Sequence, residues 1–289
     1  KELKNIILHF EPTTIFVMAQ RIPDTAFVTL GNHLGIKTIM MQHGLYIPFM
    51  KRDIKFFISK LKKLFRYILY SFVISKTINK SYLSTLFNYF KVYCLGYNES
   101  EITFPHSKMN AKEVLIYGEY WKEYHVKKFS YDIDSFCIIG YPDYVDIKCR
   151  KFLKRKNTVC YIAQSLVEDG RLPREQMLSF VKMFSKIVEK LSLQVYIKPH
   201  PRSDMSLYSE LLNSGAKVVL DDLPLCHKFV GHYSSLLAMA SFHDKPLFLY
   251  KFHNHNEYPE YFIDSCDFYS NSYNDLFNNL ILKLLNNND

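Results

Sequence analysis

The sequence predicts an α/β protein built from two doubly wound units in tandem, each with a parallel sheet. Short apolar runs typical of strands alternate with stretches of helical periodicity. The runs are continuously apolar, as in parallel sheets that are covered on both faces. The alternation stops at a lysine-rich stretch, residues 148–157, and then begins again. We therefore expect one unit over residues 1–147 and another over 148–289.

Five apolar runs predict the strands of the first unit: 13–19, 36–42, 90–96, 113–118 and 136–142. Between the first two runs, Ala26, Leu30 and Leu34 recur at helical spacing. Gly35 follows this pattern and predicts the end of a helix, because glycine readily adopts the left-handed conformation found there.

Five further runs predict the strands of the second unit: 158–164, 193–199, 216–222, 227–231 and 246–252. After the first of them, Pro173 is typical of a helix start, and Met177, Val181 and Phe184 share one helical face. Ligands of doubly wound sheets bind beyond the carboxyl ends of the strands. Polar motifs at these ends are therefore the candidates for a functional site.

The composition excludes a disordered chain, since 48% of the 289 residues are hydrophobic and 22% are charged. The six cysteines are scattered without a CxxC pair. This argues against a disulfide framework or a zinc cluster and favours a reducing, cytoplasmic compartment. The chain begins at Lys1 without a methionine or a signal-like segment. A first unit that lacks part of its N-terminal fold is therefore an alternative to a whole one.

Almost all of the net charge of +9 lies in residues 51–80, which hold nine Lys or Arg residues and one acid, Asp53. The cations are interleaved with aromatic and aliphatic residues, and the apolar run 65–76 is too short to span a bilayer. We expect a basic amphipathic helix that lies on an anionic membrane surface. An ordinary helix with a solvated basic face and a nucleic-acid-binding patch are the alternatives.

The motif Gln42-His43-Gly44 ends the second predicted strand. Gly44 allows a tight turn, and a histidine at the sheet edge suits a general base because its pKa lies near neutrality. His43 is therefore our candidate catalytic base, and a loop histidine without a catalytic role is the alternative. Gln42 and Gly44, with Arg21 and Asp24 near the start of the preceding helix, are candidate binding residues at the same edge.

The stretch 163–173, AQSLVEDGRLP, ends the first strand of the second unit. Glu168 and Asp169 are candidate catalytic carboxylates, and Gln164 is a candidate binding residue. The alternative is a simple connection, because the pair Asp169-Gly170 is typical of a turn and is followed by a helix start.

Residues 198–204, KPHPRSD, end the next predicted strand. The flanking prolines restrict the backbone, so the imidazole of His200 is held at low entropic cost. A plain turn is the alternative, but a stiff histidine between cations at a strand end favours a phosphate site. Lys198, His200, Pro201 and Arg202 are the candidates for this phosphate site.

Residues 231–242, GHYSSLLAMASF, follow the strand at 227–231, and Ser234 is well placed to cap a helix. The alternative is that Ser234 is only this cap. A helix start with two hydroxyls also offers free N–H groups and a positive dipole end to an anion. Gly231 permits a close backbone approach, and the candidates for this anion site are Gly231, Tyr233, Ser234 and Ser235. Because parallel strand ends share one edge, we expect these residues to converge with His200.

The order of His200-Pro201, Ser234-Ser235 and the strand at 246–252 resembles bacterial two-domain GT-B glycosyltransferases that use CMP-activated sugars. The lipooligosaccharide and capsule sialyltransferases and polysialyltransferases carry an acid motif, an HP motif and an SS motif. VEDG at 167–170 is similar to the acid motif in letters, but that motif usually belongs to the N-terminal domain, where this sequence has QHG instead. The resemblance covers about residues 13–252.

The resemblance implies a GT-B fold with two Rossmann-like domains, an N-terminal acceptor domain and a C-terminal nucleotide-sugar donor domain, with a cleft between them. It implies an inverting, metal-independent glycosyltransferase that moves a CMP-activated acidic sugar, similar to sialic acid or Kdo, to a glycan or lipid-linked glycan. His200 would bind the donor phosphate, and Ser234 and Ser235 the phosphate and nucleotide. The residues assigned to donor binding are Gln164, Lys198, His200, Pro201, Arg202, Gly231, Tyr233, Ser234 and Ser235. Those assigned to the acceptor side are Gln42, Gly44, Arg21 and Asp24. A base in the N-terminal domain, for which His43 is our candidate, would deprotonate the acceptor.

No cofactor and no metal are expected, since the chain has no DxD-like acidic pair placed to hold one; Asp221-Asp222 is an alternative, but it lies at a strand end without a partner in the sequence pattern. The expected role is capsule or lipooligosaccharide synthesis at the cytoplasmic face of the bacterial inner membrane, without nucleic acid. QHG followed by KPHP and YSS is also similar to CDP-glycerol glycerophosphotransferases of teichoic-acid assembly, so a CDP-polyol phosphotransferase is an alternative. A non-catalytic nucleic-acid binder that uses residues 51–80 is a third. The sugar, the acceptor, the linkage and the oligomeric state are not determined by the sequence.

Overall fold

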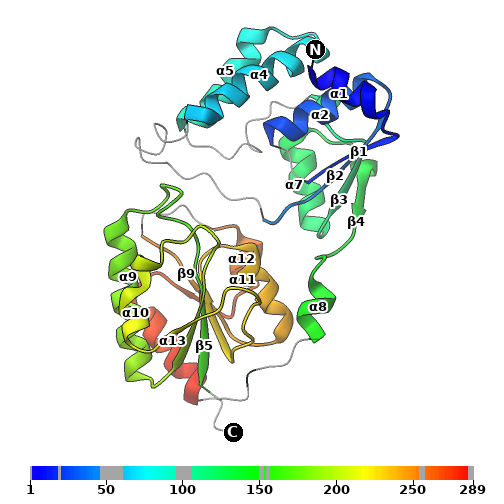
Figure 1. Ribbon diagram of the computed structural model, residues 1–289. Helices are drawn as coiled ribbons and strands as arrows, with labels where there is room; N and C mark the ends of the chain where they lie inside the picture. The colour runs from blue at the N-terminus through cyan, green and yellow to red at the C-terminus, as the bar shows by residue number, and fades with distance from the viewer. Residues whose placement is uncertain are drawn as a thin grey trace. The chain divides into compact units, whose positions relative to one another are not determined.

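The computed structural model describes residues 2–18, 21–45, 61–95, 106–149, 153, 157–253 and 258–285. The chain divides into two compact units, residues 1–142 and 143–289, and both are of the α/β class (Figure 1). The boundary lies earlier than the position expected from the sequence, because helix α8 (Tyr144–Cys149) packs within the second unit. The ring of Tyr144 lies 4.8 Å from that of Phe242, edge to face.

The described elements of the first unit are, in chain order, α1 (Glu2–Phe10), β1 (Thr14–Val17), α2 (Ile22–His33), β2 (Lys37–Met41), α4 (Leu61–Ile78), α5 (Tyr82–Leu95), η1 (Ser107–Met109), β3 (Glu113–Ile116), α7 (Glu119–Phe129), η2 (Ile133–Ser135) and β4 (Phe136–Ile138). The four strands pair in parallel in the order β1-β2-β3-β4.

Side chains of the first sheet alternate between buried and accessible positions. Ile15 and Val17 of β1 are buried, whereas Phe16 between them is 50% exposed. Helix α2 packs closely on the buried face, where a Cβ at Gly31 would lie 2.6 Å from a methyl carbon of Ile15. The prediction of strands buried on both faces is therefore wrong for this unit in the described residues.

The predicted strand at 90–96 is wrong, because residues 82–95 form helix α5. The run reads as a strand by its aromatic and β-branched residues, but Thr85 and Tyr89 recur at helical spacing and are buried. The ring of Tyr89 stacks against Tyr67 of α4 at 6.2 Å. Packing between the helices thus outweighs a local strand preference.

The second unit contains η3 and η4 as short 3-10 turns and a longer series of strands and helices: α8, β5 (Thr158–Ile162), α9 (Arg174–Lys190), β6 (Gln194–Lys198), η3 (Met205–Tyr208), α10 (Ser209–Asn213), β7 (Lys217–Val218), β8 (Lys228–Gly231), α11 (Ser235–Ala240), η4 (Ser241–His243), β9 (Leu247–Tyr250), α12 (Glu260–Asp264), β10 (Phe268–Ser270) and α13 (Tyr273–Leu285). The predicted helix after Pro173 and all five predicted strands are present. Strand β10, three residues long, was not expected from the sequence.

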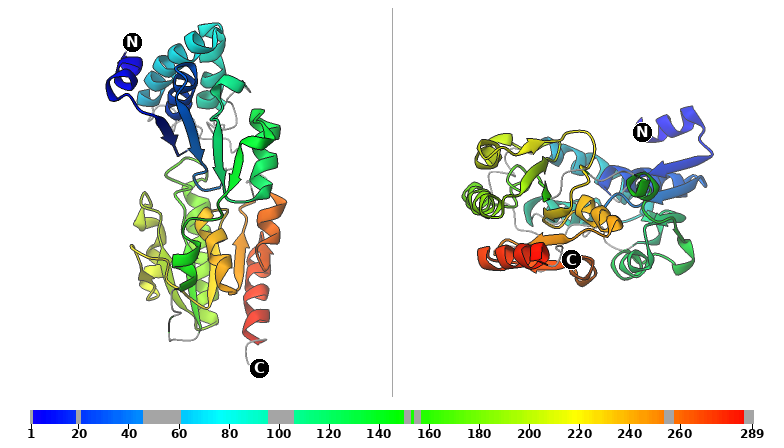
Figure 2. Two further views of the ribbon diagram at one scale, coloured as in Figure 1. Left: turned by 90° about the vertical axis from the view of Figure 1, so that its right-hand side faces the viewer. Right: turned by 90° about the horizontal axis from the view of Figure 1, so that it is seen from below.

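The second sheet is doubly wound, with six parallel strands in the order β10-β9-β8-β5-β6-β7. Its central strands β5, β8 and β9 are buried at every position, as predicted for this unit. Helices α9 and α13 share one hydrophobic core cluster, and α11 and α12 lie on the other side of the sheet (Figures 1 and 2). The chain runs outward from β5 in both directions, so β5 and β8 mark the topological switch point where such folds bind ligands.

Candidate functional site

In the first unit, the loop that carries the QHG motif is fixed by Gln42. This side chain is fully buried; its Nε2 donates to the carbonyl oxygen of Gly44 (3.0 Å), and its Oε1 accepts from the backbone N–H of Tyr117 (3.1 Å). The N–H of Gly44 donates to the Tyr117 hydroxyl (3.3 Å), and Gly44 has φ 68°, a left-handed conformation that favours glycine. Gln42 and Gly44 thus build the turn, and Tyr117 is a supporting residue that the sequence analysis missed.

His43 is exposed in this loop, directly beyond the carboxyl end of β2. Arg21 is the exposed N-cap residue of α2, which follows β1, the parallel neighbour of β2. Asp24 lies in the first turn of α2, where a carboxylate is favoured by the helix dipole. His43, Arg21 and Asp24 therefore belong to the carboxyl edge of the first sheet.

In the second unit, three neighbouring strands bring the donor-side motifs to one edge. Ile162 of β5 pairs with Lys198 of β6 and with Gly231 of β8, so the three strands reach this edge at the same level. The amide of Gln164, two residues further along, donates to the carbonyl oxygen of Tyr233. The loops after β5, β6 and β8 therefore meet at the switch point, as the parallel topology predicts.

The imidazole of His200 is oriented by its own loop. The backbone N–H of Arg202 donates to its Nδ1 (3.1 Å), and the backbone N–H of His200 donates to the hydroxyl of Ser203 (3.1 Å). Partial burial, with the Arg202 charge as the next contribution, lowers the pKa of His200. Since Nδ1 accepts a hydrogen bond, the neutral ring carries its proton on Nε2 and can donate it to a ligand.

Asp169 and Arg202 form a two-pronged ion pair. Nη1 of Arg202 lies 2.6 Å from Oδ1 of Asp169, and Nη2 lies 3.1 Å from Oδ2. The hydroxyl of Ser165 donates to the same carboxylate (3.1 Å). Asp169 is nearly buried, whereas the arginine side chain is 56% exposed. The carboxylate is therefore bound on both oxygens, and the loop after β5 holds the loop after β6.

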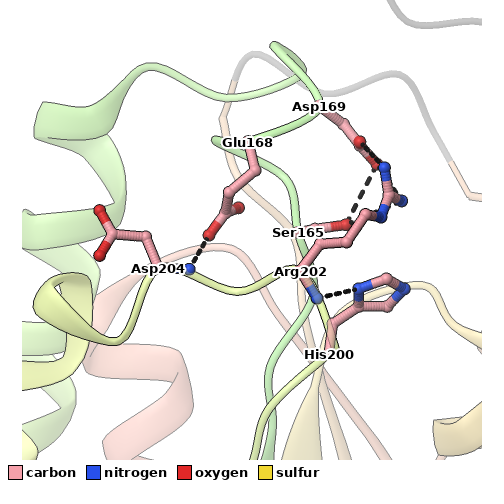
Figure 3. A network of polar contacts seen from close by, with 6 residues as sticks. All are labelled: Ser165, Glu168, Asp169, His200, Arg202 and Asp204. Carbon is pink, nitrogen blue, oxygen red and sulfur yellow. Dashed lines mark hydrogen bonds and ion pairs between the residues drawn. The ribbon is translucent and has the colours of Figure 1, made fainter.

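Glu168 points away from Asp169 (Figure 3). It contacts the far end of the loop after β6, residues 199–204, here called the histidine loop. Its Oε1 accepts a hydrogen bond from the backbone N–H of Asp204. Asp204 in turn pairs with Arg174 at 2.9 Å, and this hydrogen bond lowers the pKa of Asp204 to about 2. Both acids of the VEDG motif thus anchor the histidine loop.

Two of the residues assigned to donor binding have structural contacts. The Lys198 ammonium donates to the carbonyl oxygens of Leu220 and Asp221, the latter at 3.1 Å. A Cβ at Gly231 would lie 3.3 Å from the Ile162 carbonyl oxygen, so the glycine accommodates β5. Pro201 is exposed within the histidine loop.

Ser234 is the N-cap of α11, and its hydroxyl accepts from the backbone N–H of Leu237 (3.1 Å), as the sequence analysis expected. Ser234 and Ser235 are both partly accessible. Tyr233 is buried and donates or accepts a hydrogen bond with Tyr261 (2.7 Å). Its side chain therefore supports the turn from within.

The sequence analysis missed His232 and Ser165, which support the site from beneath. His232 is fully buried; its Nδ1 lies 2.8 Å from the Tyr250 carbonyl oxygen and its Nε2 lies 3.1 Å from the Tyr161 hydroxyl. These contacts fix the start of the YSS turn. Both residues stand beside noted motifs, but neither spacing nor residue type distinguishes such supporting roles.

No group of three or more His, Cys, Asp or Glu side chains that could hold a metal ion is found in the described part of the chain. Among the described helices, none is both long and apolar enough to cross a membrane.

The two parallel sheets place the chain in the GT-B class of glycosyltransferase folds. The polar motifs of the second unit lie in loops at the switch point of its sheet, where doubly wound folds bind ligands. The chain belongs to the alpha-2,8-polysialyltransferase (POLYST) family, which it matches over residues 1–225. No curated protein matches it.

Among solved structures, the chain is similar to UDP-GlcNAc 2-epimerase from Neisseria meningitidis bound to UDP-GlcNAc, with a TM-score of 0.55 and 9% identity, over 97% of this chain and 70% of the other. UDP-GlcNAc 2-epimerase from Methanocaldococcus jannaschii gives a TM-score of 0.50 and 10% identity, over 96% and 71%. S. aureus MnaA with UDP gives a TM-score of 0.49 and 10% identity, and this chain spans 59% of the length of that protein. At such identities the likeness shows the fold alone.

Proposed function

We propose that the protein is an inverting glycosyltransferase that moves a CMP-activated acidic sugar to a surface glycan acceptor without a metal ion. Membership of the polysialyltransferase family supports the reaction class. The observation that carries the proposal is the position of His200 at the switch point, where its Nδ1 accepts a hydrogen bond from the backbone N–H of Arg202. That bond directs a neutral Nε2–H donor toward a ligand.

His200 is suited to the donor phosphate because its proton stays on Nε2 near neutral pH. Its lowered pKa favours the neutral ring, and a hydrogen bond to a charged phosphate oxygen is stronger than one between neutral groups. The Arg202 guanidinium, 56% exposed, adds positive charge beside the ring although its inner edge is paired with Asp169. Ser234 and Ser235 supply further donors at the neighbouring strand end.

His43 is the proposed catalytic base, and the geometry of Asp169 supports this choice. Both oxygens of Asp169 already accept hydrogen bonds from Arg202, and Oε1 of Glu168 accepts one from the Asp204 backbone. A general base needs an accessible lone pair, and His43 is exposed. His43 and His200 belong to different units, so the proposal requires that both units bind the same pair of substrates.

In the proposed reaction, His43 takes the proton of the acceptor hydroxyl as its oxygen attacks the anomeric carbon of the donor sugar. The bond between that carbon and the phosphate oxygen breaks on the opposite side, so the configuration inverts and CMP leaves. His200, Ser234 and Ser235 stabilise the negative charge on the departing phosphate. Most of the rate enhancement then comes from positioning and from fixed hydrogen-bond donors.

The donor and the location are parts of the same proposal. The structural neighbour from Neisseria meningitidis is bound to UDP-GlcNAc, which supports a nucleotide-linked sugar as donor; cytidine rests on the HP and SS motifs. We place the enzyme in capsule or lipooligosaccharide synthesis, peripheral at the cytoplasmic face of the inner membrane. The basic segment 51–80 would provide the contact, and its residues 51–60 lie outside the described part of the chain.

Calorimetry with CMP, CDP and UDP tests the donor site. We expect a preference for cytidine nucleotides that His200→Ala weakens roughly ten- to a hundredfold, the value of one charge-assisted hydrogen bond. His253→Ala, which removes an exposed histidine from the same unit, should bind as the wild type does. Equal binding by wild type and His200→Ala would contradict the assignment.

The mass of the product then identifies the group transferred. An acceptor that gains an acidic sugar supports the proposal, whereas an acceptor that gains a polyol phosphate identifies the CDP-polyol phosphotransferase instead. RNA binding with a steep salt dependence and no response to nucleotides would identify a nucleic-acid binder.

A further inference from the structure

The outer faces of α4 and α5 carry a row of exposed apolar side chains, and the membrane contact proposed above for the basic segment 51–80 does not extend to those of α5. Phe65 is 70% exposed, Leu69 62%, Leu83 73% and Phe87 60%. Ile68, Phe72 and Phe90 are also exposed. On each helix these residues recur at intervals of three and four, so they form one stripe per helix.

The opposite stripes of the same helices are buried in the first unit. Tyr67 and Ile74 of α4 and Tyr89 of α5 pack in one cluster with Ile22 and Ala26 of α2. A helix on the surface of a globular protein normally has one apolar face toward the core and a polar face toward water. Helices α4 and α5 have an apolar face on both sides, which marks the outer one as an interaction surface.

The two outer stripes adjoin each other. The ring of Phe72 on α4 lies 5.8 Å from that of Tyr82 on α5, edge to face, and the Tyr82 hydroxyl donates to the carbonyl oxygen of Ile68 (3.3 Å). The helices run side by side in each view (Figures 1 and 2). They therefore present one continuous surface, here called the α4–α5 face: Phe65, Ile68, Leu69, Phe72, Leu83, Phe87 and Phe90.

The charge around this face has one sign. Residues 54–98 contain eight Lys or Arg residues and no Asp or Glu. Arg66, Lys76 and Lys80 are exposed, and the Lys76 ammonium lies 6.0 Å from the ring centre of Phe72. Long cationic side chains beside aromatic rings are typical of helices at a membrane interface, where the stems pack on apolar groups and the charges reach the headgroups.

We propose that the α4–α5 face inserts into the interface of an anionic lipid bilayer, with both helices parallel to the membrane. A protein partner or a second copy would need no such exclusion of acidic residues, whereas anionic headgroups favour it. Each Lys or Arg near such a surface strengthens binding about fivefold. The face includes Leu83, Phe87 and Phe90 of α5, beyond the basic segment recognised in the sequence, and it does not depend on the transferase reaction.

Fluorescence with brominated lipids tests the insertion. Phe87→Trp places a probe on the face, and Leu220→Trp places one at a 70% exposed position of the second unit as a control. The one native tryptophan, Trp121, is buried and supplies a constant background. With vesicles of phosphatidylcholine and phosphatidylglycerol, we expect a blue shift and bromine quenching for Phe87→Trp and neither for Leu220→Trp.

Co-sedimentation with the same vesicles measures the affinity. Phe65→Ser and Phe87→Ser should each weaken binding roughly tenfold, while Leu220→Ser should have no effect. Vesicles of phosphatidylcholine alone should bind weakly. Equal binding to both kinds of vesicle, or quenching only in Leu220→Trp, would overturn the proposal. So would a dimer in solution that Phe87→Ser dissociates, in a protein that does not bind vesicles; normal circular dichroism shows that each variant folds.

Discussion

The carboxylate of Asp169 accepts two hydrogen bonds from the guanidinium of Arg202, with Nη1–Oδ1 at 2.6 Å and Nη2–Oδ2 at 3.1 Å. The backbone of the same arginine donates to Nδ1 of His200. Asp169 therefore affects His200 through Arg202: it holds the loop whose backbone orients the imidazole. This relationship supports our proposal that Asp169 is a positioning residue and that His43 is the base.

Asp169→Asn should lower donor affinity while turnover at saturating donor changes little. The amide keeps a hydrogen-bond acceptor for Arg202 but loses the charge, so the histidine loop is held less firmly, and we expect roughly a tenfold rise in the donor Kd. Calorimetry and single-turnover rates separate the two quantities. Arg202→Gln breaks the same pair and also removes the positive charge beside His200, so its donor Kd should rise further. Loss of turnover with donor binding intact would identify Asp169 as the base.

His43→Ala should lower turnover by about 10²–10⁴ and keep donor binding, because a general base acts only as the acceptor hydroxyl loses its proton. The rates are measured under single-turnover conditions with saturating donor. His33→Ala, at the end of α2 in the same unit, is the control. Near-normal turnover in His43→Ala, together with its loss in Glu168→Ala, would place the base in the VEDG motif.

Ser234→Asp separates helix capping from phosphate binding. Aspartate caps helices as well as serine does, so the melting temperature should stay within about 2 °C of the wild type. A carboxylate beside the donor phosphate should nevertheless repel it, and we expect donor affinity to fall more than tenfold. Ser234→Ala should lose about 1 kcal/mol of stability with the cap. Normal donor binding by Ser234→Asp would show that Ser234 only caps α11.

Gln42→Glu should destabilise the first unit by about 1–3 kcal/mol at neutral pH. The buried Nε2 donates to the Gly44 carbonyl, and a carboxylate oxygen in its place accepts only, so two acceptors face each other. Protonation of the new carboxyl would restore a donor, so part of the loss should be regained on acidification. Denaturant unfolding followed by the fluorescence of Trp121, which lies in this unit, gives the free energy. A stability loss that does not depend on pH would contradict this account.

The buried His125 predicts a loss of stability in mild acid. Burial, partly offset by the hydrogen bond to the Trp121 carbonyl, lowers the pKa of His125 from 6.5 to about 4. The unfolded chain therefore binds the proton first as the pH falls, and the free energy of unfolding decreases between pH 6.5 and 4, by about 3 kcal/mol. Trp121 fluorescence reports this unfolding.

His125→Phe should remove this dependence. The free energy of unfolding of the wild type minus that of the variant should therefore decrease as the pH falls from 6.5 to 4. Acidic groups that titrate at lower pH contribute equally to both proteins. Parallel curves for the two proteins would show instead that the pKa of His125 is the same in the folded and unfolded chain.

Local patterns predicted most elements of the second unit. Strands β5, β6, β8 and β9, the helix start after Pro173 and the Ser234 cap of α11 are all present. The reason is that periodicity and capping depend on residues close together in the chain. The same reasoning was wrong at 90–96, where α5 packs against α4, and it missed β10 because a three-residue edge strand leaves little pattern.

The sequence by itself determined the parallel α/β class and the position of each polar motif at a strand end, because both follow from short-range apolar patterns. Only the tertiary structure decided which side chains meet there. Asp169 and Arg202 are 33 residues apart and pair because β5 and β6 are neighbours in the sheet. Lys198 looks like a ligand residue in the sequence, but its ammonium binds the carbonyls of Leu220 and Asp221. Such contacts depend on strand order and packing, which no local pattern specifies.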